Sequence, residues 1–243
     1  ETLGTGLLDW GRRALGVTIN EFYGQTECNM VVASAGCLMP PRPGCMGRPV
    51  PGHRVDVIGA DAAPVADGVL GDIAVMAPDP VMFLGYWNDG EATALKYRGP
   101  WLVTGDQGIR HADGFIQFVG RDDDVITSAG YRIGPGEIED CLVRHHAVQL
   151  AAAVGKPDPN RTEIVKAYVL LRQGVEPTDA LKAELQEFVK TRLAAHEYPR
   201  EVEFVAELPM TTTGKIVRKA LRARAAAEAG ARDKPPAGRL SQS

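Results

Sequence analysis

Three consecutive aspartates, Asp122-Asp123-Asp124, interrupt the chain near its midpoint and constrain its fold more than any other feature. Aspartate is unfavourable in strands, so such a run favours a turn or a linker. Before it, over residues 36–120, short β-like runs alternate with turn signals, as in a small barrel or sandwich. After it, helical and β patterns alternate. We therefore predict two units that join at the aspartates.

The first unit is predicted to open with the end of a helix over residues 5–15. A short strand over Val17–Phe22 should follow and should leave the sheet in a loop over Tyr23–Glu27. The β-rich part is expected to hold strands at 54–58, 71–76, 101–104 and 115–119.

The second unit is predicted to be a small α+β domain over residues 123–224. It should open with a hairpin turning at Ala129-Gly130 and continue into a helix with Pro135 near its start. Ile138, Cys141, Leu142 and His145 recur with helical spacing and predict one buried stripe. Strands at 148–155, 163–171 and 201–205, a helix capped by Thr178 and a basic final helix should complete the unit. Residues 225–243 lack periodicity and are expected to form a disordered tail.

Composition excludes several classes of protein. The net charge of −4 argues against a general nucleic-acid binder. No apolar run approaches the roughly 18 residues of a membrane span, so no integral membrane segment is expected. The four cysteines form no C-x-x-C pair and no histidine lies at zinc spacing, so we expect free thiols in a reducing, cytoplasmic setting.

Two stretches of the first unit offer ligands for a nucleotide. Tyr23-Gly24-Gln25-Thr26-Glu27 places a hydroxyl beside a carboxylate, and a carboxylate is a ligand that Mg²⁺ prefers. In Thr104-Gly105-Asp106, an aspartate just past a strand is placed to accept hydrogen bonds from ribose hydroxyls. Taken singly, each also fits an ordinary turn.

Three further stretches pair glycine with a basic side chain. Gly120-Arg121 precedes the aspartates and offers a guanidinium to ribose or phosphate, although an Arg–Asp surface pair would explain it equally. Ser128–Glu139 is rich in glycine, which suits either close approach to a narrow ligand or a tight hairpin. In Thr211–Lys215, a lysine follows a glycine and could reach a phosphate; it lacks the full phosphate-loop pattern and also fits a surface loop.

In their order and spacing these five stretches resemble the adenylate-forming superfamily of acyl-CoA synthetases, peptide-synthetase adenylation domains and luciferases. The likeness runs from Glu21 to Arg222 and extends to GCMGRPVPG at 44–52, Gly85-Tyr86-Trp87 and Tyr198-Pro199-Arg200. The chain is most similar to the medium-chain acyl-CoA synthetases. The resemblance implies an α/β and α+β, multi-domain fold: the end of a large AMP-binding domain with a β-barrel-like subdomain (1–122), then a mobile C-terminal domain.

The resemblance also implies the substrates ATP, coenzyme A and a carboxylic acid, with Mg²⁺. In such enzymes the acid forms an acyl-adenylate, and the CoA thiol then displaces AMP. Two catalytic contacts would be to phosphate, from Thr26 and Lys215, and Glu27 would hold Mg²⁺. The remaining nucleotide and CoA contacts would come from Glu21, Phe22, Tyr23, Gly24, Gln25, Asp106, Arg121, Ala129, Gly130, Tyr131, Arg132 and Arg161. Asp123 would be the hinge, and a second Mg²⁺ would lie at Val143, His145 and Val148.

Departures from the family pattern limit what the chain is expected to do alone. The Ser/Thr/Gly-rich loop that grips the outer phosphates is not in this sequence, so the chain resembles the C-terminal part of a longer enzyme that lacks its N-terminal partner. Gly24 stands where acetate-using relatives have a tryptophan, which implies a medium-chain or aromatic acid. An enzyme that loads a carrier-protein thiol and a non-catalytic binding module are the alternatives. Assembly into a homo-oligomer is left open.

Overall fold

The computed structural model describes residues 5–212 and 214–232, which divide into two compact units at Asp123/Asp124. No helix among these residues is long and apolar enough to cross a membrane. The elements of the first unit are α1 (Thr5–Trp10), a π-helix η1 (Gly11–Leu15), β1 (Phe22–Gln25), β2 (Asn29–Ala33), β3 (Arg48–Pro49), β4 (Val55–Ile58), β5 (Leu70–Met76), α2 (Gly90–Leu95), β6 (Tyr97–Arg98), β7 (Trp101–Arg110) and β8 (Ile116–Arg121).

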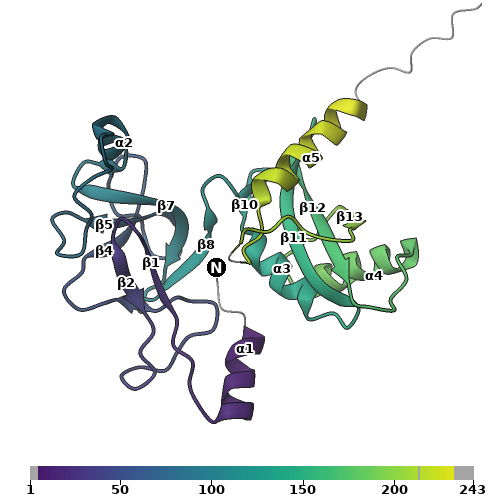
Figure 1. Ribbon diagram of the computed structural model, residues 1–243, viewed down its shortest axis with the longest axis horizontal. Helices are drawn as coiled ribbons and strands as arrows, with labels where there is room; N and C mark the ends of the chain where they lie inside the picture. The colour runs from purple at the N-terminus through teal and green to yellow at the C-terminus, as the bar shows by residue number, and fades with distance from the viewer. Residues whose placement is uncertain (1–4, 213, 233–243) are drawn as a thin grey trace, which may run out of the picture. The chain divides into compact units, whose positions relative to one another are not determined.

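Two antiparallel sheets build the described part of the first unit (Figure 1). A three-stranded sheet has the order β1-β2-β3. A five-stranded sheet has the order β4-β5-β7-β6, and β8 pairs with β7. Buried apolar residues of both sheets, including Val31, Val57, Ile73, Leu102 and Ile116, form one core. The β-rich subdomain is therefore confirmed.

Two strand predictions in this unit were wrong in their bounds. The strand predicted at Val17–Phe22 begins only at Phe22, because the backbone of Tyr23 and the following residues pairs with β2. Tyr23–Gln25 therefore lies in a strand rather than a loop. The strand predicted to end at Thr104 continues to Arg110, because Asp106 pairs with Arg121 of β8. Asp106 thus lies within β7, directly after Gly105, whose φ of 83° makes the strand irregular.

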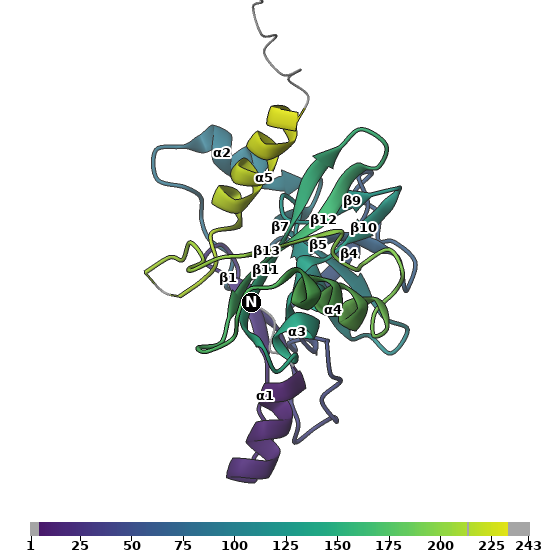
Figure 2. The ribbon, with the colours of Figure 1, turned by 90° about the vertical axis from the view of Figure 1, so that its right-hand side faces the viewer.

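The second unit is a layered α/β structure. Its elements are β9 (Ile126–Ser128), β10 (Tyr131–Ile133), α3 (Pro135–Val143), β11 (Val148–Asp158), β12 (Thr162–Leu171), α4 (Asp179–Lys190), β13 (Glu201–Phe204) and α5 (Arg218–Arg232). The sheet has the order β10-β9-β12-β11, and β13 pairs with β12 in parallel. The long β11–β12 hairpin can be followed in Figure 2.

Side chains of β11 point alternately to the two faces of this sheet, and each face packs against different helices. Ala151 and Ala153 pack with the apolar faces of α3 and α4, whereas Ala152 and Val154 pack with Leu221 and Ala225 of α5. Successive strand side chains point to opposite faces, so one strand serves both cores. The buried stripe of α3 is confirmed for Ile138, Cys141 and Leu142, whereas His145 is buried beyond the end of the helix. Thr178 is confirmed as the N-cap of α4, where its side chain accepts from the Leu181 amide.

The disordered tail predicted for 225–243 was wrong for residues 225–232. These continue α5, because Ala225 is fully buried against the sheet and Glu228 pairs with Lys156 and Lys166. An alanine-rich stretch also has high helix propensity without any apolar periodicity. Residues 233–243 lie outside the described residues.

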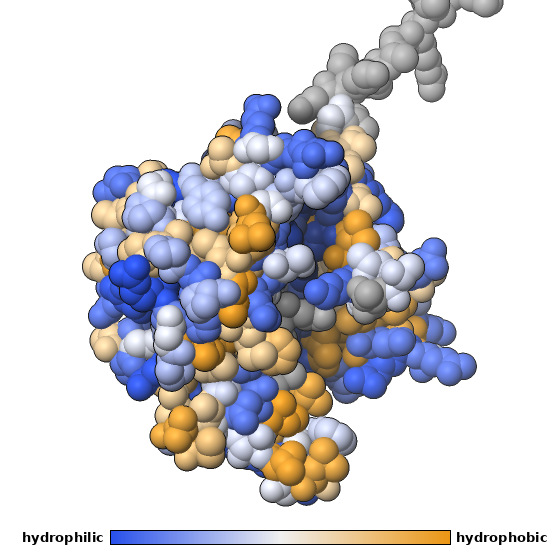
Figure 3. Space-filling model, turned by 60° about the vertical axis from the view of Figure 1, so that its left-hand side comes forward, coloured by the Kyte–Doolittle hydropathy of each residue, from blue (hydrophilic) through white to orange (hydrophobic). Residues whose placement is uncertain are grey.

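Apolar side chains remain exposed at the start of the first unit. Figure 3 shows orange side chains gathered at the lower end of the view, over α1. The exposed set at the start of this unit consists of Leu7, Trp10, Leu15, Val17 and Phe22. The four cysteines are free thiols, of which Cys37 is exposed and the other three are buried.

Candidate functional site

The β1–β2 hairpin presents Thr26 and Glu27 at its turn. Gln25 pairs with Asn29 across a three-residue loop, and Asn29 has a φ of 51°, a conformation that asparagine tolerates well. Thr26 is exposed at this turn and Glu27 is half-buried. The backbone N–H of Phe83 donates to the Glu27 carbonyl at 2.8 Å, which ties the turn to a second segment.

Strand pairing brings together residues far apart in the sequence. Asp106 of β7 and Arg121 of β8 are register partners, and the Tyr23 hydroxyl donates to Asp106 Oδ2 at 2.7 Å. Burial, followed by the nearby Asp106 carboxylate, raises the pKa of Tyr23 far above its usual range, so the phenol stays a hydrogen-bond donor. A carboxylate held this way can accept from a diol while its partner strand offers a guanidinium.

Gln25 is held from the side by two groups. Its Nε2 donates to the Thr104 carbonyl at 3.1 Å, and Lys96 Nζ lies 3.5 Å from its Oε1. Lys96 also donates to the Thr104 carbonyl at 3.3 Å. Gln25 is therefore fixed beside the Thr104-Gly105-Asp106 stretch. Glu21 and Phe22, which were also predicted for the nucleotide site, have different surroundings. Phe22 is 68% exposed, and the Glu21 amide donates to Ser34 Oγ at 2.7 Å.

The carboxylate of Glu27 is kept ionised by its neighbours. The Tyr86 hydroxyl donates to Glu27 Oε1 at 2.5 Å, and this bond is the main reason that the pKa of Glu27 is lowered despite some burial. Lys96 and Arg121 add smaller electrostatic contributions. The same bond raises the pKa of Tyr86 to about 12. The donor set, a carboxylate kept charged next to an exposed hydroxyl, fits a hard divalent cation.

In the second unit, Ala129 and Gly130 form the two-residue turn of the β9–β10 hairpin. Both have positive φ, 50° and 85°, as a type I′ turn requires. The Ala129 amide donates to the Arg161 carbonyl at 2.9 Å, so two residues that were predicted separately lie next to each other. The neighbouring Tyr131 ring stacks on His196 with centroids 4.1 Å apart. Arg132 is exposed on β10.

Lys215 lies exposed on a different loop of this unit. The loop is closed by Thr211, whose N–H donates to the Lys215 carbonyl at 2.8 Å and whose Oγ1 accepts from the Lys215 N–H at 3.0 Å. Three residues later Arg218 donates to both carboxylate oxygens of Glu139, at 3.1 and 2.5 Å, which anchors the loop to α3. Arg222 forms a close pair with Asp124.

The predicted second metal site at Val143, His145 and Val148 coincides with a buried histidine contact. His145 is 3% exposed, its Nε2 lies 3.1 Å from Glu184 Oε1, and its Nδ1 accepts from the Ala147 N–H at 3.3 Å. Together with His146 and Glu184 it offers ligand atoms within 4.8 Å of one another. Both ring nitrogens of His145 thus contact neighbouring groups of the fold, and the second metal site stays a prediction.

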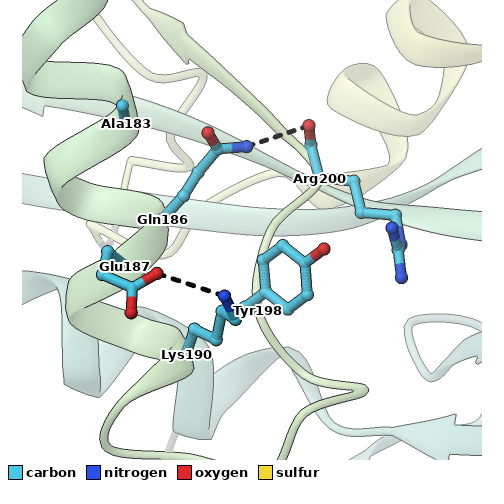
Figure 4. A pocket seen from close by; sticks show the side chains of 6 residues that line it. All are labelled: Ala183, Gln186, Glu187, Lys190, Tyr198 and Arg200. Atoms are coloured by element: carbon cyan, nitrogen blue, oxygen red, sulfur yellow. Dashed lines mark hydrogen bonds and ion pairs between the residues drawn. The ribbon is translucent and has the colours of Figure 1, made fainter.

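The Tyr198-Pro199-Arg200 stretch borders a shallow hollow on α4 (Figure 4). Gln186 Nε2 donates to the carbonyls of Pro199 and Arg200 at 3.0 Å, and Lys190 pairs with Glu187. These contacts hold the segment that enters β13. The stretch therefore has a structural role in this unit.

Comparison with known proteins places both units in one family. The model of the AMP-binding enzyme matches residues 1–87, and that of the AMP-binding enzyme C-terminal domain matches residues 137–215. The acetyl-coenzyme A synthetase of Bacillus subtilis is 39% identical over 92% of this chain and 39% of its own length. The human mitochondrial acyl-coenzyme A synthetase ACSM1 is 44% identical over 88% of this chain and 38% of its own length.

Among solved structures, an anthranilate CoA ligase crystallised with anthranoyl-AMP matches with a TM-score of 0.85 and 33% identity, over 95% of this chain and 44% of that one. The chain thus spans about two fifths of the length of the relatives it matches. It belongs to the AMP-binding enzyme family, and its relatives are acyl-CoA ligases and synthetases.

Sequence reasoning missed three contacts at these sites. Tyr86 was noticed only as part of a family stretch, and its contact with Glu27 needed the fold of the 83–90 segment. Lys96 and His196 carry no local signal, because each acts through a partner more than 60 residues away.

Proposed function

We propose that this chain is the C-terminal part of an AMP-forming carboxylic acid–CoA ligase. The observation that supports it most is the convergence, within one unit, of Tyr23, Asp106, Arg121 and Glu27 around the β1–β2 turn and the β7–β8 pair. A non-catalytic module would have no reason to retain this set.

In the proposed reaction, Asp106 and Arg121 bind the ribose hydroxyls of ATP, and Thr26 contacts the α-phosphate. Glu27 holds Mg²⁺, which neutralises phosphate charge when bound. Lys215 places an ammonium where negative charge develops as the carboxylate attacks, and a single contact of this kind typically contributes roughly 3–4 kcal/mol. The Ala129-Gly130 turn, with Tyr131, lines the path of the CoA thiol in the second step.

The test uses the full-length enzyme with Lys215→Ala. We expect ATP–pyrophosphate exchange to fall by about 10²–10³-fold, whereas thioester formation from supplied acyl-adenylate stays close to that of the unchanged enzyme. Lys219→Ala, which removes a neighbouring exposed lysine at the start of α5, is the matched control. Unchanged exchange in Lys215→Ala would remove this lysine from the reaction.

For the acid, we propose a medium-chain or aromatic carboxylate. The proposal rests on the resemblance alone, in which acetate-using relatives carry a tryptophan where Gly24 stands. Five extra buried CH₂ groups of a longer acid would contribute about 4 kcal/mol in gross terms. A tryptophan at this position cannot be the test, because even a Cβ at Gly24 would meet the Asn29 carbonyl oxygen at 1.6 Å. Specificity constants of the unchanged full-length enzyme for acetate through decanoate and for benzoate decide it. Acetate as the best substrate would contradict the proposal.

A further inference from the structure

The Gly85-Tyr86-Trp87 stretch has no role in the reaction proposed above, yet its tyrosine touches the site. The Tyr86 hydroxyl donates to Glu27 Oε1 at 2.5 Å, although the Tyr86 side chain is 38% exposed. An exposed tyrosine gains little from burial, so a short bond to one carboxylate oxygen is its most specific interaction. Among the hydrogen bonds of the described residues, the other oxygen of Glu27, Oε2, takes part in none.

The backbone around Tyr86 is fixed at several points. Its N–H donates to Thr93 Oγ1 at 2.9 Å, and the Thr93 hydroxyl donates in turn to the Asp89 carbonyl at 2.8 Å. Gly85 has a φ of 142°, which residues with a side chain rarely adopt, and a Cβ there would lie 3.2 Å from the Thr93 side chain, so a larger residue would be strained at this position. The start of helix α2, where Asp89 caps the Ala92 amide, therefore determines where Tyr86 lies.

The segment that holds Phe83 and Tyr86 makes two hydrogen bonds to Glu27. The Phe83 N–H donates to the Glu27 carbonyl at 2.8 Å, and the Phe83 ring packs edge-on against Tyr86 with centroids 5.1 Å apart. Phe83 also packs against the buried core of the first unit. The backbone and the side chain of Glu27 are thus both hydrogen-bonded to the segment that holds Phe83 and Tyr86. This is the arrangement expected where a carboxylate must keep a single orientation, since metal-ligating carboxylates are themselves hydrogen-bonded.

We propose that Tyr86 is a positioning residue for Glu27: it occupies Oε1, holds the carboxylate in one rotamer, and leaves Oε2 available to a divalent cation that would accompany ATP. The inference rests on the proposed function. It gives the Gly85-Tyr86 pair a specific task, in which the glycine places the tyrosine and the tyrosine orients the ligand.

The experiment measures metal binding directly in the full-length enzyme. Binding of Mn²⁺ in the presence of α,β-methylene-ATP is followed by electron paramagnetic resonance, and the Mg²⁺ dependence of ATP–pyrophosphate exchange is measured in parallel. For Tyr86→Phe we expect the half-saturating metal concentration to rise about tenfold in both measurements. At saturating Mg²⁺ the exchange rate should recover, and thioester formation from supplied acyl-adenylate should be unchanged.

Two controls separate positioning from general damage. Trp87→Phe alters the adjacent, 91% exposed side chain and should leave the metal dependence unchanged. In a Glu27→Gln background, Tyr86→Phe should cause no further loss of metal affinity, because the two residues act through one contact. Unchanged Mn²⁺ affinity in Tyr86→Phe, or a full tenfold further loss in the Glu27→Gln background, would overturn the proposal.

Failure of the proposed function gives a different result. If the full-length enzyme without substitutions catalysed no ATP–pyrophosphate exchange with any acid, the proposed ligase activity would be contradicted. The Mn²⁺ measurement requires no turnover, and it still decides whether Tyr86 orients Glu27.

Discussion

At the scale of single residues, Gly24 shows how closely the β1–β2 turn is packed. A Cβ built on Gly24 would lie 1.6 Å from the Asn29 carbonyl oxygen and 2.9 Å from Met30 Cα, both backbone atoms that cannot move alone. We predict that Gly24→Ala lowers the free energy of unfolding of this chain by about 1–3 kcal/mol, as overpacking typically does. Urea denaturation followed by circular dichroism measures the change.

Gly136→Ala is the matched control. Gly136 lies in the first turn of α3, and a Cβ there meets nothing within 4 Å. Alanine is the better helix former, so this variant should be neutral or more stable by up to about 1 kcal/mol. Equal effects of the two substitutions would show that the close contact at Gly24 relaxes at no cost.

The residues of the first unit's site were predictable by type but not by contact. Asp106 and Arg121 were chosen for their chemistry in glycine-containing stretches and Tyr23 for the family resemblance, and the structure joins the three. Their contact depends on the β7–β8 register and on a tyrosine that reaches across 83 residues of sequence. Local periodicity predicts neither the register nor this contact, because strand pairing is set by the packing of a whole sheet.

At the scale of elements, a cluster of charges joins α5 to the sheet of the second unit. Glu228 of α5 accepts from Lys156 of β11 at 3.2 Å and from Lys166 of β12 at 2.5 Å. Both lysines are 2% exposed, and they also pair with Glu201 and Glu203 of β13 at 2.7 and 2.6 Å. Four elements thus share one ion cluster. This long-range contact is why local sequence signals misassigned the last turns of α5 to a tail.

We predict that Glu228→Gln destabilises this chain by about 1–3 kcal/mol at neutral pH, because two buried ammonium groups lose a charged acceptor. Burial raises the pKa of Glu228, but the pairs with Lys166 and Lys156 outweigh it and lower the pKa below its ordinary value of 4.5. The contribution is therefore complete above about pH 4.5 and is lost as the pH falls through the lowered value.

Urea denaturation at several pH values measures this difference. The gap between the unchanged chain and Glu228→Gln should shrink on acidification below pH 4.5, while the exposed Glu207→Gln should show almost no gap at any pH. A gap that stays constant from pH 7 to pH 3 would rule out the ionised carboxylate as its source.

At the scale of the whole molecule, the boundary between the two units falls between neighbouring aspartates whose ion-pair partners belong to different units. Asp123 pairs with Arg121 at 3.4 Å, at the end of the first unit, and Asp124 pairs with Arg222 of α5 in the second. The run of three aspartates allowed the sequence to predict this junction, since no regular element accommodates it. Which side chain belongs to which unit depended on α5, and that could not be foreseen.

We propose Asp123, which lies at this boundary, as the hinge between the two half-reactions. In the proposed reaction, one of them would need Lys215 and the other the Ala129-Gly130 turn. Proline fixes φ near −65°, so Asp123→Pro in the full-length enzyme should restrict rotation at this point. We predict that it slows one half-reaction at least about tenfold more than the other, since hinge changes act on the conformational step.

Asp123→Ala is the control: it removes the pair with Arg121 but leaves φ free, and it should slow both half-reactions little. Single-turnover rates of adenylate formation and of thioester formation measure the two steps separately. Equal loss of both steps in Asp123→Pro, or the same imbalance in Asp123→Ala, would show that rotation about this residue does not separate the two reactions.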